Sequence, residues 1–149
     1  MDSQYIKNMP MKAPGLAIKA GSSALAKVSN TVPYKIDGSI YSVAAGDLPA
    51  LTGINLAASQ SVQLSVYVTK AGAFGIAAGT IVASPQTDAL GNTIIGVRTN
   101  AGAVPAGAAV VGHIILTTDN SHTFTGGTTA LDAAGITATY IDTFGYSGV

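Results

Sequence analysis

The sequence predicts an all-β domain: a small antiparallel sandwich or barrel, preceded by an extended N-terminal arm. Runs rich in β-branched and aromatic residues recur every 8–12 residues with turn-forming residues between them, which is typical of sandwiches and barrels. No segment carries the hydrophobic period of a long helix. Ala, Gly, Ser and Thr fill 71 of the 149 positions. We therefore expect a thin core, because small side chains each bury little apolar area.

The arm is predicted over residues 1–30 and the β-structured body over residues 31–149. The first segment has no clear hydrophobic period, and any helix longer than about two turns there would be broken by Pro10, Pro14, Gly15 and Gly21. Five of the six lysines lie at positions 7, 12, 19, 27 and 35, where only Asp2 opposes them. The rest of the chain carries two cations against six aspartates. This asymmetry predicts that the basic arm docks onto a partner.

The body begins with a predicted β-hairpin. Asp37-Gly38 lies between Tyr34–Ile36 and Ile40–Val43, two runs of aromatic and β-branched residues. Asp-Gly is favoured in a type I′ turn, because both central residues of that turn need positive φ. The sequence therefore places a two-residue turn here.

Further strands are expected along the remainder of the body. Ser61–Thr69 alternates between apolar and polar residues, the pattern of a half-buried strand. The other expected strands are Ala73–Ala77, Thr80–Ala83, Thr93–Arg98, Ala109–Thr117, Thr123–Thr125 and Ile136–Asp142. Between the last two, Thr128 or Thr129 could cap a single helical turn that ends at Gly135.

The composition excludes several classes of chemistry. Without any Cys, the chain can form no disulfide, thiolate metal site or cysteine nucleophile. Only 9% of residues are charged, against roughly 25% in typical domains. This composition fits a soluble domain whose surface is hydrated through Thr, Ser and Asn side chains. We favour the alternative, a protein whose surface is covered in an assembly. The N-terminus lacks the apolar region of a signal peptide and no stretch is apolar enough for a membrane span, so we expect no membrane partner.

Candidate catalytic and metal-binding residues are few. The only imidazoles belong to His113 and His122, and their spacing with Asp119 does not force three ligands to converge. We expect His113 to pack in a strand and His122 to lie near a turn. No G-x-S-x-G elbow, close carboxylate pair or phosphate-binding glycine loop occurs, and the lysines are too sparse for nucleic-acid binding. The sequence predicts no enzyme, no cofactor, no metal site and no nucleic-acid partner.

Three segments carry a family resemblance. They read AKVSNTVPYKIDGSIYSV, VPAGAAVVGHIIL and FTGGTTALDAAGITATYID, and the resemblance that rests on them extends from Lys19 to Tyr140, which is most of the body. In these segments the chain resembles the head decoration, or cement, proteins of tailed bacteriophages. The resemblance implies a virion structural protein on the capsid exterior, made in the host cytoplasm. It also implies a homotrimer that clamps adjacent major capsid subunits without a cofactor.

The arm is predicted to be the capsid-docking element. Its lysines would approach an acidic surface and its apolar side chains would bury contact area; the residues expected to dock are Lys7, Lys12, Leu16, Ile18, Lys19 and Lys27. The alternative for this segment is a disordered extension without a role. For the whole chain, one alternative is another virion component: a head fibre, a tail tube or a tail-fibre module. A carbohydrate-binding β module is the other, which the absence of Trp disfavours.

Overall fold

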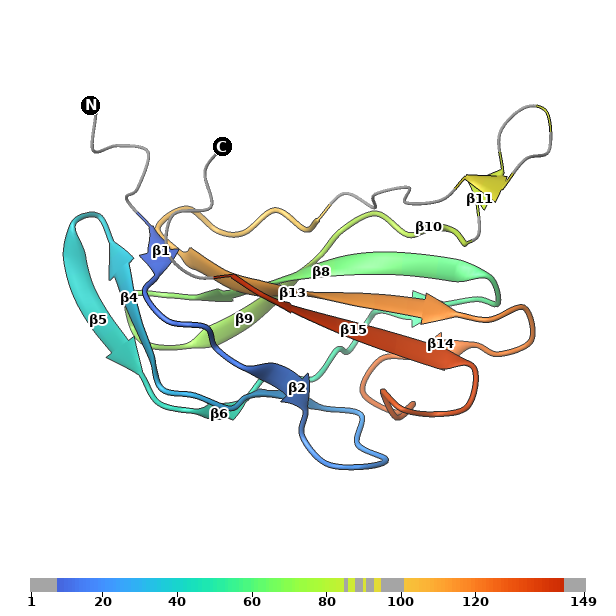
Figure 1. Cartoon of the computed structure of the whole chain (residues 1–149), viewed down its shortest axis with the longest axis horizontal. Helices are drawn as coiled ribbons and strands as arrows, with labels where there is room; N and C mark the ends of the chain where they lie inside the picture. Colours follow the sequence, from blue (N-terminus) through green and yellow to red (C-terminus); the bar gives the residue numbers. More distant parts are fainter. Residues whose placement is uncertain (1–7, 85, 88–89, 91–92, 95–100, 144–149) are drawn as a thin grey trace.

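A computed structural model of the chain describes residues 8–84, 86–87, 90, 93–94 and 101–143, and these residues form an all-β fold. The largest sheet places β8 (Gln60–Val68) beside β13 (Ala109–Thr118), which pairs in turn with β15 (Ile136–Asp142). Along the other edge of β8 run β9 (Phe74–Ala78) and β10 (Val82–Ala83). We call these five antiparallel strands the main sheet (Figure 1).

Two smaller antiparallel sheets complete the sandwich. One has the order β1-β4-β5, with β1 (Met9–Pro10), β4 (Val32–Ile36) and β5 (Ser39–Val43), and the other has the order β2-β3-β6, with β2 (Leu16–Ile18), β3 (Ala26–Val28) and β6 (Gly46–Asp47). Two further pairs join β7 (Asn55–Leu56) to β14 (Phe124–Thr125) and β11 (Gln86–Thr87) to β12 (Thr93–Ile94). The expected fold class is confirmed as an antiparallel sandwich, since none of the described sheets closes into a barrel.

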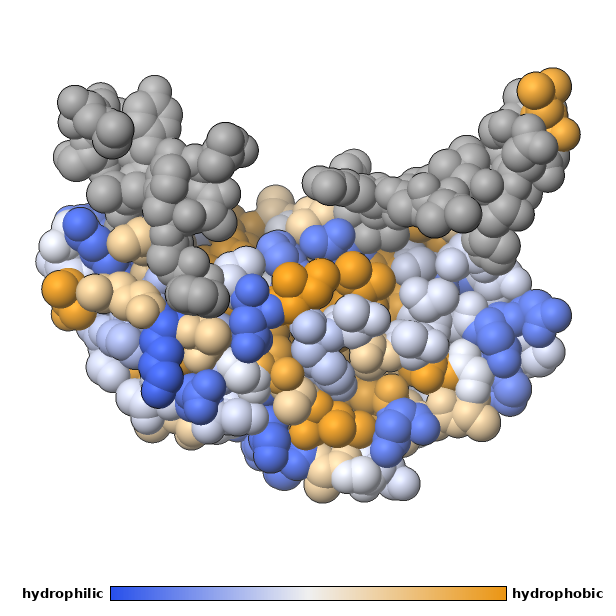
Figure 2. Space-filling view, viewed as in Figure 1, coloured by the Kyte–Doolittle hydropathy of each residue, from blue (hydrophilic) through white to orange (hydrophobic). Residues whose placement is uncertain are grey.

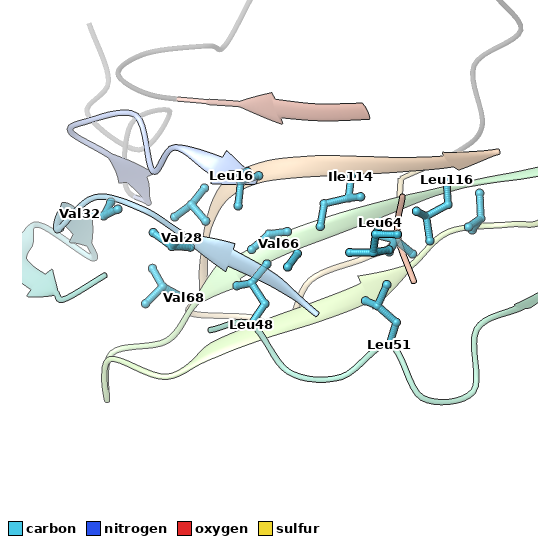
Figure 3. Packing of buried hydrophobic residues seen from close by; sticks show 14 of the residues in the cluster. Leu16, Val28, Val32, Leu48, Leu51, Leu64, Val66, Val68, Ile114 and Leu116 are labelled. Carbon is cyan, nitrogen blue, oxygen red and sulfur yellow. The ribbon is translucent and has the colours of Figure 1, made fainter. Parts of the chain in front are cut away.

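The core lies between the main sheet and the two smaller sheets (Figure 3). In β8 the predicted core-facing side is confirmed, because the side chains of Val62, Leu64, Val66 and Val68 are all 0% exposed. The strand is more than half-buried, however, because Ser61 and Ser65 on the opposite side are buried as well. The neighbouring strand β13 carries a bulge between Val110 and Gly112. A Cβ atom at Gly112 would lie 2.5 Å from the Ile141 carbonyl oxygen, so glycine permits this close approach.

The predicted Asp37-Gly38 hairpin is confirmed. β4 and β5 pair from Val32 opposite Val43 to Ile36 opposite Ser39, which leaves a two-residue turn. Both turn residues have positive φ, 50° for Asp37 and 83° for Gly38, as a type I′ turn requires. The turn therefore fixes which residues of the two strands face each other.

Residues 8–30 do not stand apart from the body as an arm. They form β1, β2 and β3, and the side chains of Leu16, Ala26 and Val28 are at most 7% exposed within the common core. Their strands are only two or three residues long, too short to show a period in the sequence. The segment is extended, as expected, but its strands pair with β4 and β6 and its apolar side chains face inward.

The expected helical turn between β14 and β15 is wrong. Consecutive turns occupy this stretch instead, and one of them is closed by the backbone N–H of Thr129 donating to the Thr125 carbonyl at 2.8 Å. The Thr129 hydroxyl accepts a hydrogen bond from the Thr125 N–H at 2.9 Å, so it caps a turn rather than a helix. The strand expected at Thr93–Arg98 is seen at Thr93–Ile94, and the rest of that range lies outside the described residues.

Candidate functional site

The residues expected to dock onto a capsid do not form one projecting surface. Leu16 is buried in the core and is not available to a partner, whereas Ile18 is partly buried against that core. Lys19 forms an ion pair with Asp47 at 2.5 Å. Lys12 is exposed, Lys27 is half-buried, and Lys7 lies outside the described residues. Of the six residues, Lys12 and Lys19 are the exposed ones among those described.

Aspartates of the body bind the N-terminal segment directly. The Asp142 carboxylate accepts hydrogen bonds from the backbone N–H groups of Gly15 at 3.1 Å and Leu16 at 2.9 Å. Asp132 accepts from the Ser22 N–H with both oxygens, at 3.0 and 2.9 Å. Acidic side chains of the body thus bind the N-terminal segment through its backbone N–H groups. Part of the negative charge of the body is therefore engaged within the molecule.

An exposed apolar surface lies on the outer side of the β1-β4-β5 sheet. Met9, Lys35 and Ile40 are cross-strand neighbours in one row, and they face away from the core because the adjacent row, Tyr34 with its neighbours, faces inward. Ile40 is 67% exposed and Met11 is 46% exposed. We call Met9, Met11, Lys35 and Ile40 the hairpin face. It combines apolar area with a positive charge.

Several polar contacts brace the hairpin below this face. The Asn8 side-chain carbonyl accepts from the Asp37 N–H at 3.1 Å, and its amide nitrogen donates to the Ala108 carbonyl at 3.1 Å. Lys70 pairs with Asp37 at 2.8 Å, and this hydrogen bond and charge raise the Lys70 pKa. The hairpin tip is therefore held by Asn8, which precedes β1, and by Lys70, which lies in the turn between β8 and β9.

Inside the hairpin two aromatic rings support it. Tyr34 and Tyr41 stack with their ring centroids 5.6 Å apart, and the buried Tyr34 hydroxyl donates to the Thr69 carbonyl at 2.9 Å. Burial, followed by the nearby Tyr41, raises the Tyr34 pKa. This packing on the inner side of the hairpin holds the backbone that carries the hairpin face in a fixed shape.

The histidines and Asp119 lie where the sequence placed them. His113 is half-buried in β13, and His122 is exposed in the turn that follows this strand. His122 Nδ1 lies 2.8 and 2.9 Å from the two carboxylate oxygens of Asp119. Hydrogen bonds from the Ser121 N–H and from His122 lower the Asp119 pKa. This pair braces a turn, and the described residues contain no cluster of three metal-ligating side chains.

His113 has an unusual environment for a polar side chain. Its Nδ1 atom is buried without a hydrogen-bond partner. Desolvation by burial lowers the pKa of its imidazole. Its cross-strand neighbours on the main sheet are Ser65 and Ile141, neither of which carries a charge. The neutral ring is therefore favoured in the folded protein.

A pocket of about 260 Å³ lies between residues 49–54 and strand β9. Its walls expose polar as well as apolar atoms, and they are formed by Pro49, Ala50, Leu51, Thr52, Gly53, Ile54, Ile76 and Ala78. Leu51 is buried whereas Ala50 and Ala78 are exposed, so the pocket extends from the core to the surface. Sequence reasoning missed this pocket, because its walls come from two segments with no common motif.

Comparison of the chain with known protein families, curated proteins and solved structures found no match. Within the described part of the chain, no helix is long and apolar enough to cross a membrane. The surface view in Figure 2 shows hydrophobic side chains reaching the surface among polar ones. The candidate functional sites are therefore surfaces: the hairpin face and the pocket beside Leu51.

Proposed function

We propose that this chain is a head decoration, or cement, protein of a tailed bacteriophage. In this proposal it binds the outside of the capsid, made by the major capsid protein, and stabilises the contacts between neighbouring subunits. It acts as a homotrimer on the virion, is made in the host cytoplasm, and has no catalytic role and no cofactor.

The observation that carries the proposal is the arrangement of the three segments that resemble this family. The first segment provides β3, β4 and β5, the second provides most of β13, and the third provides β14 and β15. β13 pairs with β15 along seven residue pairs and also contacts β4. Segments that are far apart in the sequence thus form one connected framework. This supports a resemblance of whole domains rather than of low-complexity stretches.

The hairpin face is the docking surface that we propose. Ile40 and Met11 would supply apolar contact area, while Lys35 and the nearby Lys12 would favour an acidic partner surface. This replaces the projecting arm, because the apolar residues expected to dock, Leu16 and Ile18, are used in packing the core. A preformed sheet face also loses less conformational entropy on binding than an arm that orders on contact.

Other virion roles remain the second candidate. A head fibre, a tail tube or a tail-fibre module would use the same sandwich and the same low charge. A carbohydrate-binding module is disfavoured, because the chain has no Trp to provide a stacking platform.

Binding to particles that lack the protein tests the proposal. Purified protein is mixed with such particles, and the bound amount is measured after sedimentation of the particles. We expect saturable binding to heads and none to isolated tails. The Ile40→Asp variant should bind at least about tenfold more weakly, because it places a charge in an apolar contact. Binding to tails alone would favour the second candidate, and binding to neither would reject both.

A further inference from the structure

Strand β5 forms a free edge of the β1-β4-β5 sheet. It pairs with β4 along its whole length, and no other strand in the described part of the chain pairs with it. β5 lies at the outer margin of the sandwich, at the left of Figure 1. Three of its residues, Ser39, Ile40 and Ser42, are exposed. This edge is therefore accessible to another chain.

The register shows which backbone groups reach the edge. The residues that flank a two-residue turn form a hydrogen-bonded pair, and hydrogen-bonded and non-hydrogen-bonded pairs alternate from there. Lys35 opposite Ile40 and Pro33 opposite Ser42 are therefore non-hydrogen-bonded pairs. The Pro33 carbonyl agrees with this, because it accepts from the Met11 N–H at 2.8 Å on the side of β1. The N–H and C=O groups of Ile40 and Ser42 consequently point away from β4, toward the free edge.

β5 has none of the features that usually prevent an edge strand from pairing. Proteins protect such edges with lysine, proline or a bulge, or they keep the edge strand very short. β5 has five residues, SIYSV, without a charge or a proline, and its register with β4 is continuous. The strand at the opposite edge of the same sheet, β1, has only two residues and contains Pro10. Of the two edges, β5 is therefore the one that accepts another strand.

The sequence of β5 suits a second copy of itself. In antiparallel pairing centred on Tyr41, Ile40 of each copy lies opposite Ser42 of the other, and each of these pairs exchanges both of its hydrogen bonds. Tyr41 then lies opposite Tyr41 of the second copy, and cross-strand aromatic pairs stabilise sheets. Tyr41 already stacks on Tyr34 with the ring centroids 5.6 Å apart, so the pairing joins the tyrosines of both copies in one row. No like charges meet along the paired strands, because β5 has no charged residue.

We propose that two copies of this chain pair through β5, antiparallel and around a two-fold axis at Tyr41. The β1-β4-β5 sheets of the two copies then form one continuous sheet. The side chain of Ile40 stays on the outer side of this sheet, so two hairpin faces lie side by side and can bind a partner together. The contact is isologous and closes with two copies. It is therefore separate from the trimer proposed above, and it does not depend on a capsid.

Disulfide cross-linking tests the pairing directly, because the chain has no cysteine of its own. One batch carries Ile40→Cys and a second batch, with a tag that changes its mass, carries Ser42→Cys. A hydrogen-bonded antiparallel pair places the two Cα atoms about 5.5 Å apart, within the usual range of a disulfide. We expect an oxidised product that joins the two batches. The control replaces Ser42→Cys with Ser121→Cys, which is also exposed but lies in the turn after β13, and it should give little product.

Sedimentation equilibrium of purified protein supplies the second measurement. Ser42→Pro removes the outward N–H without removing a hydrogen bond to β4, and Ser42→Lys places a charge on the edge, as naturally protected edge strands do. Each substitution should weaken self-association at least about tenfold. Thr137→Lys makes the same change of charge at an exposed site of β15 and should leave self-association unchanged. Circular dichroism confirms that each variant is folded.

The proposal is overturned by a wild-type protein that stays monomeric at the highest concentration, by unchanged association of both Ser42 variants, or by equal cross-linking of the control pair. If the purified protein stays monomeric while Ser42→Pro loses binding to particles, β5 takes up a strand of the capsid partner instead. The self-pairing is measured without particles, whereas Ile40→Asp tests binding to particles, so the two proposals fail separately.

Discussion

The Asp142 carboxylate and the backbone N–H of Leu16 are separated by 126 positions in the sequence, yet they form a hydrogen bond of 2.9 Å. The same carboxylate holds the Gly15 N–H at 3.1 Å. Through these two bonds the last described strand, β15, fixes the entry to β2. Leu16 is consequently presented to the core, where its side chain contributes to the packing of both layers.

Removing this carboxylate should loosen the N-terminal segment. Asp142→Ala leaves two backbone N–H groups without their charged acceptor, and we expect a loss of about 1–2 kcal/mol in the free energy of unfolding. Asp47→Ala is the matched control, because it removes an exposed ion pair with Lys19, which should contribute less than about 1 kcal/mol. Urea denaturation measures both. Equal effects of the two substitutions would argue against the role given to Asp142.

Leu16 should behave as a core residue rather than a docking residue. Leu16→Ala should cost roughly 2–4 kcal/mol, since it leaves a cavity beside Gly112 in β13. Met11→Ala, at a side chain that is 46% exposed, should cost well under 1 kcal/mol by the usual behaviour of surface sites.

A chain that begins at residue 28 should not fold stably, because it lacks the core side chains of Leu16 and Ala26. Thermal unfolding measured by circular dichroism decides, and a fully stable truncated chain would restore the arm as a separate element.

The Asp37-Gly38 turn should not tolerate a β-branched residue. Gly38 has a φ of 83°, and Gly38→Val should cost roughly 1–3 kcal/mol, because valine strongly disfavours positive φ. Gly46→Ala serves as the control, because Gly46 does not have positive φ and an added Cβ there would meet no atom within 4 Å. A Gly38→Val protein with the melting temperature of the wild type would contradict the turn type.

His113 should make stability depend on pH. Its folded-state pKa is lowered from 6.5 by desolvation, so the unfolded chain binds a proton first as the pH falls. Stability should therefore be complete above about pH 7, decline as the pH falls through 6.5, and level off below the folded-state pKa. His113→Gln should remove this part of the pH dependence. Urea denaturation between pH 7.5 and 5 tests it, and identical pH profiles of the two proteins would contradict the lowered pKa.

The sequence predicts those parts of the fold that depend on local patterns. Asp37-Gly38 fixes a two-residue turn, and once this turn is placed, counting outward from it pairs Lys35 with Ile40. The alternation of Ser61–Thr69 likewise predicts which side of β8 faces the core, as the full burial of Leu64 confirms. In both cases the local structure is determined by a few residues that are neighbours in the sequence.

Long-range contacts account for what the sequence does not predict. β2 and β3 have three residues each, so their burial depends on partners such as Asp142 that are distant in the chain. The turns that begin at Thr125 replace a helix, because hydrogen bonds to Thr125 satisfy the backbone locally. The pocket near Leu51 arises where a loop meets β9, and no residue pattern marks such a meeting.

A density map of the assembled virion tests the central claim most directly. Particles assembled with this protein are compared by electron cryomicroscopy with particles that lack it, and the difference density is fitted with the sandwich. The account predicts density on the outer surface of the head, where neighbouring capsid subunits meet, with the β4–β5 hairpin directed at the shell. Difference density in the tail, or on the head with the hairpin directed outward, would contradict it.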